Sequence, residues 1–198
     1  MDSLIFDLSV FPTVVLLSDN KVVDLSKNEQ TQNSDTFLLM VDNLLKNNKK
    51  QINDIKRIFI NVGPGSFTGL RVAISISKGL GFAGDIEFCT YTTFDYVDGA
   101  NSNVLVSGFS NFVYLKTHDG TMSCENCSNL DKTNEYITFE EELYSKLKSK
   151  INIKLVEKVG FDQVTLKAKM GVSISTLEPL YLRKSQAEIQ REERINKK

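Results

Sequence analysis

The chain has 198 residues, of which 41% are hydrophobic and 25% charged, and it carries a formal net charge of -1 at pH 7. These values are typical of a soluble globular protein with enough apolar residues for a sizeable core. A protein that binds nucleic acid by itself usually has an excess of Lys and Arg over Asp and Glu. The composition therefore argues against a protein that binds nucleic acid alone.

The amino-terminal residues and the cysteines bear on where the protein resides. Asp2 lies within a short apolar stretch that fits neither a signal peptide nor a membrane helix. The cysteines Cys89, Cys124 and Cys127 leave an odd thiol, which argues against a secreted disulfide framework. We expect a cytoplasmic protein that does not enter a membrane.

The first third of the chain predicts three strands and a helix. Residues 4–7, 13–17 and 21–25 are short apolar or β-branched runs separated by turn residues, which indicates a meander. Ser34 or Asn33 can cap a helix over residues 34–47, and its Leu39 lies on the polar side with Asp42 and Lys46. Residues 55–61 predict the next strand.

A turn rich in glycine follows that strand and precedes a helix over residues 68–82. It consists of Gly63, Pro64, Gly65, Ser66, Phe67, Thr68, Gly69, Leu70 and Arg71. Three glycines and a proline in this space indicate a backbone that needs unusual angles or close approach. We therefore expect something to pack close to this turn.

Backbone N–H groups at a helix start attract anions, so a phosphate-binding loop is one interpretation of this turn. A Walker loop requires a lysine after its last glycine, where this chain has Leu70 and Arg71. The glycine spacing also differs from the G-x-G-x-x-G of dinucleotide-binding proteins. The turn therefore predicts neither of these nucleotide loops.

The remaining elements complete one β-β-β-α-β-α-β unit and begin a second. A strand over residues 86–91 closes the first unit, and further strands are expected at residues 104–107, 112–116, 121–124 and 151–156. A helix over residues 139–148 has acids in its first turn and lysines at its end. Residues 184–198 indicate a solvated or frayed helix.

The turn, together with residues 72–80, resembles the signature of the TsaB family, also called YeaZ. Weaker similarities lie at residues 5–9, 91–94 and 179–183. The resemblance implies an α/β protein with the actin-like ATPase (RNase-H-like) fold, built from two lobes with mixed central sheets. We expect an amino-terminal lobe over residues 1–92 and a reduced second lobe over residues 93–198.

The resemblance also implies a function. It predicts a noncatalytic subunit that pairs with and activates the TsaD catalytic subunit, which makes N6-threonylcarbamoyladenosine beside the anticodon of tRNA. A TsaE-type ATPase and a homodimer are further partners left open, and tRNA would be contacted only indirectly. The alternative is a self-standing ATPase or small-molecule kinase of the same fold.

The helix over residues 68–82 suggests where a partner would dock. Its small residues Gly69, Ala73, Ser77 and Gly81 recur every four positions, and its apolar arc covers roughly 200°, about twice what one core face needs. In the family that the chain resembles, the matching helices pack against TsaD. The predicted interface is Leu38, Val41, Leu45, Leu70, Ala73, Ile74, Ser77, Lys78 and Gly81. The competing interpretation is that both helices are buried within one molecule.

Catalytic and metal-binding residues are not expected. His118 is the only histidine, and Cys124 with Cys127 supplies at most half of a zinc site. Asp7 could orient a metal–nucleotide complex at the end of the first strand, but the residues after it lack the glycines that let a hairpin approach phosphate. A turn-forming role for Asp7 is favoured. No intrinsic cofactor is predicted, and ATP or ADP at the joint interface with the partner is left open.

Overall fold

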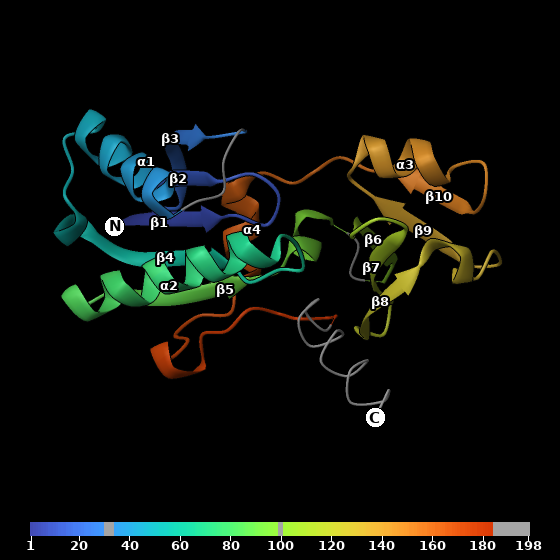
Figure 1. The fold of residues 1–198 in the computed structure, drawn as a ribbon. Coiled ribbons are helices and arrows are strands. Elements are labelled where there is room, and N and C mark those ends of the chain that lie inside the picture. The colour runs from blue at the N-terminus through green and yellow to red at the C-terminus, as the bar shows by residue number, and fades with distance from the viewer. Residues whose placement is uncertain (30–33, 99–100, 184–198) are drawn as a thin grey trace, which may run out of the picture.

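The computed structural model describes residues 1–29, 34–98 and 101–183, and contains two five-stranded sheets side by side (Figure 1). The first sheet contains β1 (Asp2–Asp7), β2 (Thr13–Ser18), β3 (Lys21–Lys27), β4 (Ile55–Asn61) and β5 (Glu87–Tyr91), in the order β3-β2-β1-β4-β5. The first three strands form the predicted antiparallel meander, and β1, β4 and β5 run parallel.

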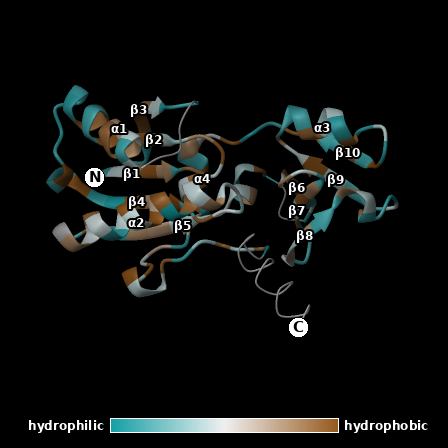
Figure 2. Cartoon of the chain, in the orientation of Figure 1, coloured by the Kyte–Doolittle hydropathy of each residue, from teal (hydrophilic) through white to brown (hydrophobic). Residues whose placement is uncertain are grey.

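Two helices cover one face of the first sheet. Alternate residues of β1 and β2, including Leu4, Phe6 and Leu16, point to this face and pack against α1 (Ser34–Asn47) and α2 (Phe67–Ala83). Helix α1 is hydrophobic on one side and hydrophilic on the other, so it buries one stripe and exposes the rest (Figure 2). Both helices lie where the sequence predicts them.

The opposite face of the first sheet is covered by a later part of the chain. Ile5, Val15 and Phe59 pack there with Val164 of α4 (Phe161–Lys167). Beyond α4, Lys169 and Thr90 exchange two backbone hydrogen bonds of 2.7 and 2.9 Å, which extend the sheet past β5. Part of the segment assigned to the second lobe therefore returns to the first, because the apolar face of this sheet would otherwise be exposed to water.

The second sheet repeats the order of the first with fewer helices. It contains β6 (Asn103–Ser107), β7 (Phe112–Lys116), β8 (Met122–Asn126), β9 (Glu135–Thr138) and β10 (Asn152–Leu155), in the order β10-β9-β6-β7-β8. Helix α3 (Glu141–Leu147) packs on one face through Leu143 and Leu147. The reduced second lobe was predicted, but β9 and α4 were missed. The predicted helix over residues 184–198 lies outside the described residues.

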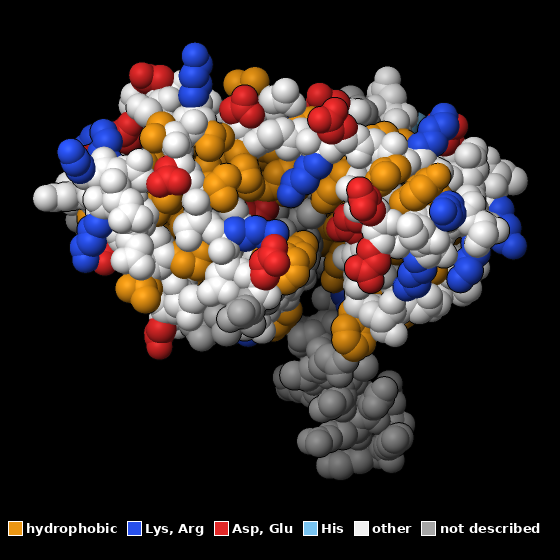
Figure 3. Space-filling model, turned by 90° about the horizontal axis from the view of Figure 1, so that it is seen from above, with side chains coloured by type: hydrophobic (Ala, Val, Ile, Leu, Met, Phe, Trp, Pro, Cys, Tyr) orange, Lys and Arg blue, Asp and Glu red, His pale blue; other side chains and the backbone are white. Residues whose placement is uncertain are grey.

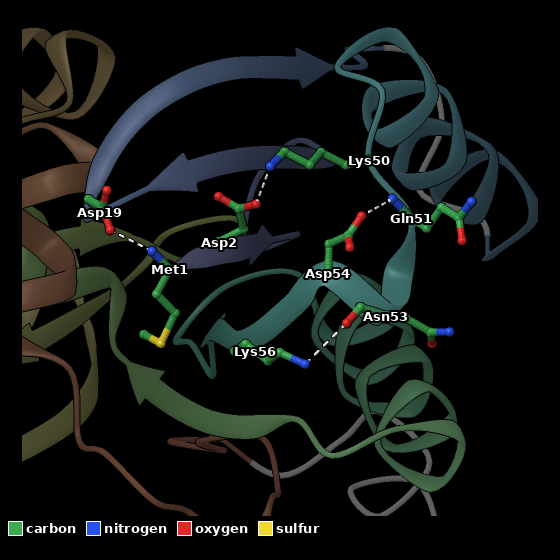
Figure 4. A network of polar contacts seen from close by, with 8 residues as sticks. All are labelled: Met1, Asp2, Asp19, Lys50, Gln51, Asn53, Asp54 and Lys56. Atoms are coloured by element: carbon green, nitrogen blue, oxygen red, sulfur yellow. Dashed lines mark hydrogen bonds and ion pairs between the residues drawn. The ribbon is translucent and has the colours of Figure 1, made fainter.

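Short polar contacts tie the amino ends of the first strands together, away from the glycine-rich turn (Figure 4). Lys50 lies 2.5 Å from Asp2 and lowers the pKa of that carboxyl. Asp54 accepts a 2.8 Å hydrogen bond from the backbone N–H of Gln51, which begins a turn of 3-10 helix before β4. These contacts set the start of β4 relative to β1. In the described residues, no helix is long and apolar enough to cross a bilayer.

Candidate functional site

The glycine-rich turn is bonded into the carboxyl end of the first sheet. Gly63 has φ 110°, and the Gly63–Pro64 peptide bond is cis. Thr93 donates hydrogen bonds from its backbone N–H to Gly63 O at 2.9 Å and from its hydroxyl to Pro64 O at 2.6 Å. Ser66 caps α2 by accepting from Gly69 N. Many polar groups of the turn are therefore engaged by the protein itself.

The glycines of the turn allow the loop after β1 to approach closely. A Cβ atom added to Gly65 would lie 2.5 Å from Ser9 O, and one added to Gly69 would lie 2.1 Å from Leu8 O. Ser66 N also donates a 2.7 Å hydrogen bond to Ser9 O. The close approach predicted from the sequence is thus confirmed, and the packing partner is the loop after Asp7.

Two glycines of α2 offer a matched test of this packing. Gly69→Ala is expected to destabilise the fold by about 1–3 kcal/mol, because the new methyl group overlaps the backbone of Leu8. Gly79→Ala is expected to be neutral or to stabilise by up to about 1 kcal/mol, because no atom lies within 4 Å and alanine favours helix. Urea unfolding of both variants measures the difference. Equal stabilities would contradict the described packing.

Asp7 is buried at the end of β1 with both carboxylate oxygens bonded. Oδ1 accepts from the N–H of Ser9 at 2.9 Å and from its hydroxyl at 2.6 Å. Oδ2 accepts from Asn61 Nδ2 at 3.1 Å and from the hydroxyls of Tyr91 and Tyr96. A carboxylate offers about four lone-pair sites, so these five donors saturate it. This geometry supports the turn-forming role of Asp7.

The two tyrosines at Asp7 serve as neutral donors. Burial raises the pKa of Tyr91 and Tyr96 well above the ordinary tyrosine value, and the charge of Asp7 raises both further. Their rings pack edge to face at 5.8 Å and their hydroxyls lie 3.1 Å apart. The strand β5 and the turn after it are thereby anchored to β1 through one carboxylate.

The other candidate catalytic or metal-binding residues, His118, Cys124 and Cys127, belong to the second sheet and its loops, whereas Asp7 belongs to the first sheet. His118 is exposed in a turn of the second sheet, where its backbone N–H donates to Oδ1 of Asn103. Cys124 and Cys127 are free thiols on and beside β8. Within residues 1–29, 34–98 and 101–183, no three His, Cys, Asp or Glu side chains gather in a way that could hold a metal ion.

The predicted interface residues are mostly buried within the protein's own core. The buried members are Val41, Leu45, Leu70, Ala73, Ile74 and Ser77. The hydroxyl of Ser77 bonds to Ala73 O at 2.8 Å, and a Cβ added to Gly81 would lie 2.4 Å from the Phe88 ring. The outward orientation expected for the small-residue stripe is wrong, because its small side chains let α2 approach its own sheet. Of the predicted set, Leu38 is exposed, and Lys78 and Gly81 are half-buried.

A different set of residues forms the outer side of the helix pair. Helices α1 and α2 contact each other and lie on the same face of the sheet, so their outer sides form one surface. We call it the α1–α2 outer face; it comprises Leu38, Leu39, Val72, Ser75, Gly79 and Phe82. Leu39 is 58% exposed and Phe82 82% exposed. In the sequence Leu39 lies among polar residues, but a singly exposed leucine is too common to identify such a face.

The carboxyl-terminal segment of the described chain spans both lobes. Leu177 is buried in the first core, and Leu180 N donates a 2.7 Å hydrogen bond to Val62 O. The Tyr181 ring stacks on Phe67 at 4.9 Å, and Leu182 packs against the core of the second sheet. We call residues 177–183 the strap. The motif at residues 179–183 thus forms a tie between the two sheets.

The strap yields a second prediction. Replacing Tyr181 by Ala and Leu182 by Ser is expected to speed tryptic cleavage after Arg183 at least about fivefold, because local opening governs proteolysis. The two sheets should keep their far-UV circular dichroism. Leu155→Ser, at an exposed apolar position of β10, is the control. An unchanged cleavage rate in the double variant would show that the strap contacts do not hold this segment.

The two sheets, each a meander continued by parallel strands, define an α/β protein of the actin-like, RNase-H-like class. Solved structures that share this fold include the following two. One is described as an uncharacterized protein with similarity to peptidase YEAZ from Pseudomonas aeruginosa, with a TM-score of 0.69 at 17% identity, covering 92% of this chain and 99% of that one. The other, YeaZ from Pseudomonas aeruginosa, has a TM-score of 0.67 at 15% identity, with coverages of 91% and 99%.

Sequence comparison points to a narrower family. The family model described as "TsaD: tRNA N6-adenosine threonylcarbamoyltransferase" matches residues 28–95. The tRNA threonylcarbamoyladenosine biosynthesis protein TsaB of Haemophilus influenzae is 32% identical over 74 residues, which are 37% of this chain and 31% of that protein. TsaB of Buchnera aphidicola subsp. Baizongia pistaciae is 32% identical over 78 residues, 39% of this chain and 35% of that protein. The resemblance to the TsaB (YeaZ) family is thereby confirmed, over about a third of the length of these curated relatives.

Proposed function

We propose that this protein is a scaffold subunit in the biosynthesis of threonylcarbamoyladenosine in tRNA, which pairs with and activates a TsaD-type catalytic subunit. The names of the similar TsaB proteins support the pathway. The near-zero net charge supports indirect contact with tRNA, because the partner would then supply the basic surface.

The observation that carries this proposal is the α1–α2 outer face. Leu39 and Phe82 expose apolar side chains, while Ser75 and Gly79 present little side-chain bulk. A helix of another protein can approach such a surface closely, and apolar side chains would be buried in the contact. We therefore keep the proposal that the two helices dock a partner. The residues that make the contact are the outer ones, and the buried small-residue stripe is not part of it.

The hydrogen bonding of Asp7 at the carboxyl end of the first sheet, together with the distant location of His118, supports a noncatalytic role. Asp7 is saturated by protein donors, and His118 lies in the second sheet. We propose that any ATP or ADP binds at the joint interface with the partner. A TsaE-type ATPase as a third component, and a homodimer through the same outer face, are parts of the same proposal.

The function is tested by mixing the purified chain with a TsaD-type subunit, tRNA and the remaining components of the modification reaction. We expect threonylcarbamoyladenosine to form with both proteins present and to fall at least about tenfold when this chain is omitted. The chain alone should release no phosphate from ATP. Steady phosphate release by the single chain, with no effect on the modification, would favour the self-standing ATPase.

A further inference from the structure

Residues 172–183, which end in the strap, run beside α2 and then reach the second lobe (Figure 1). At the last turn of α2, the side chain of Ile174 lies 3.0 Å from a Cβ atom built on Gly81. At the first turn of α2, the ring of Tyr181 stacks on Phe67 with 4.9 Å between the ring centres. This carboxyl-terminal segment therefore contacts α2 at both of its ends.

Backbone hydrogen bonds hold the same segment on the first sheet. Val172 N donates to Phe88 O at 2.9 Å. Leu180 N donates to Val62 O at 2.7 Å, and the carbonyl oxygen of Leu180 lies 3.4 Å from a Cβ atom built on Gly63. Because Val62 and Gly63 lead directly into the glycine-rich turn, displacement of the strap would also remove support from the start of α2.

The last two residues of the strap are anchored on the second lobe. Leu182 packs against the core of the second sheet. The guanidinium of Arg183 lies 5.3 and 5.4 Å from the centres of the Phe109 and Phe112 rings, which attract its charge. A cleft of about 990 Å³ separates the two sheets and is seen as a hollow in Figure 3, and both strap residues line it. The strap thus links α2 to the second lobe.

The contacts between α2 and the strap are partly exposed to solvent. The guanidinium of Arg71 lies 5.4 Å from the centre of the Phe67 ring, one turn earlier in the helix. Phe67 is 40% exposed, and Tyr181, which stacks on it, is 47% exposed. Regions held by exposed contacts open at a lower free energy than a buried core. We therefore expect the start of α2 and the strap to open before the first sheet does.

We propose that the strap and α2 open and close as one cooperative unit, so that docking of a partner on the α1–α2 outer face and closure of the strap onto the second lobe stabilise each other. Coupling between two sites is reciprocal, so a partner that binds better when α2 is closed also tightens the strap. The second lobe thereby regulates docking through the strap. The docking half of this inference rests on the proposed function, whereas the cooperative unit does not.

Hydrogen–deuterium exchange of the full chain, without a partner, tests the cooperative unit. The double variant Leu182→Ala with Arg183→Ala removes both anchors on the second lobe and leaves Tyr181 on Phe67. We expect amide exchange over residues 70–77 of α2 to become at least about fivefold faster, because the unit opens more often. Residues 40–47 of α1 should exchange as in the unmodified chain, since α1 packs on β2 and β3.

Two further variants control for the substitutions themselves. Leu182→Met with Arg183→Lys keeps an apolar side chain and a cation at the two positions, so exchange over residues 70–77 should stay within about twofold of the unmodified chain. Lys148→Ala removes another cation that lies near a ring of the second lobe, 5.6 Å from the centre of Tyr144, but outside the strap. It should leave exchange in α2 unchanged.

Exchange in the presence of a TsaD-type subunit tests the coupling to docking. Binding should slow exchange in a peptide that contains Leu180 at least about fivefold. Residues 108–112, beside the strap on the second lobe, should keep their exchange rate, which separates coupling from direct cover by the partner.

The proposal is overturned if the double alanine variant leaves exchange over residues 70–77 unchanged, or if residues 40–47 become faster to the same extent. It is also overturned if a bound TsaD-type subunit leaves the exchange at Leu180 unchanged, or slows residues 108–112 equally. If that subunit does not bind the unmodified chain, the proposed function fails, and the exchange measured without a partner alone decides whether the strap and α2 form one unit.

Discussion

Ala73→Glu is expected to prevent the protein from folding. Ala73 is fully buried where α2 packs against β1 and β4, and its neighbour Ser77 already donates to its backbone carbonyl. A glutamate there would place an unpaired charge in the core and overfill it, at a cost of several kcal/mol out of the 5–15 kcal/mol that typically stabilise a domain. We expect insoluble protein, or a soluble product without a cooperative thermal transition.

The matched control is Ser75→Glu, two residues further along the same helix. Ser75 is exposed, so the change should alter the free energy of unfolding by no more than about 0.5 kcal/mol. Thermal unfolding followed by circular dichroism measures both variants. If Ala73→Glu folded with normal stability and lost only its association with a partner, the small-residue stripe would be the docking surface and our assignment of the outer face would fail.

Asp7→Ala is expected to give the second largest loss of stability. The substitution leaves buried donors of Asn61, Tyr91 and Tyr96 without their shared acceptor, and it removes the carboxylate that holds Ser9. Each buried donor left unsatisfied costs about 1–3 kcal/mol, and relaxation or entering water recovers part of the sum. We expect a loss of about 3–5 kcal/mol and a Tm lower by about 10 °C.

Asp85→Ala controls for the loss of one acidic side chain, because Asp85 is exposed. Its Tm should match that of the unmodified chain within about 2 °C. Differential scanning calorimetry compares the two variants at one pH. An Asp7→Ala protein as stable as the control would mean that the Asp7 network does not stabilise the fold, and would restore Asp7 as a candidate for metal–nucleotide binding.

The first lobe could be read from the sequence because its elements carry strong local signals. The β-branched runs of β1 to β3 and the apolar spacing of α1 each fix an element without reference to the rest of the chain. Gly65 and Gly69 likewise indicate a close contact from the sequence alone. That the contact is with the loop at Leu8 and Ser9 is seen only in the folded chain.

The parts that could not be predicted depend on contacts distant in sequence. Strand β9 has four residues and α4 has seven, too few for a periodic pattern, and α4 is placed by packing of Val164 against the first sheet. The stripe of Ala73 and Ser77 showed that something approaches α2 closely. Whether that neighbour is the protein's own sheet or another subunit depends on the rotation of α2 about its axis. The spacing of small residues along the helix does not determine this rotation.

The cleft between the two sheets was also beyond sequence analysis, since its walls come from seven separate stretches of the chain, from Asp7 to Arg183. In the sequence Arg183 stands out only as part of the motif at residues 179–183, and Arg71 only as the end of the glycine-rich turn. The strap brings Tyr181 and Arg183 to the same opening as Phe67 and Arg71. These aromatic and basic residues meet only when the two lobes are placed together.

We propose that the catalytic subunit docks on the α1–α2 outer face, and binding of two leucine variants to a TsaD-type subunit tests this most directly. Leu39→Glu on α1 and Leu166→Glu on α4 each replace an exposed leucine by a charge, on opposite faces of the first sheet. We expect Leu39→Glu to weaken binding at least about thirtyfold in isothermal titration, about 2 kcal/mol, while Leu166→Glu binds normally. Normal binding by Leu39→Glu together with loss of binding by Leu166→Glu would contradict the account and place the partner on the α4 face.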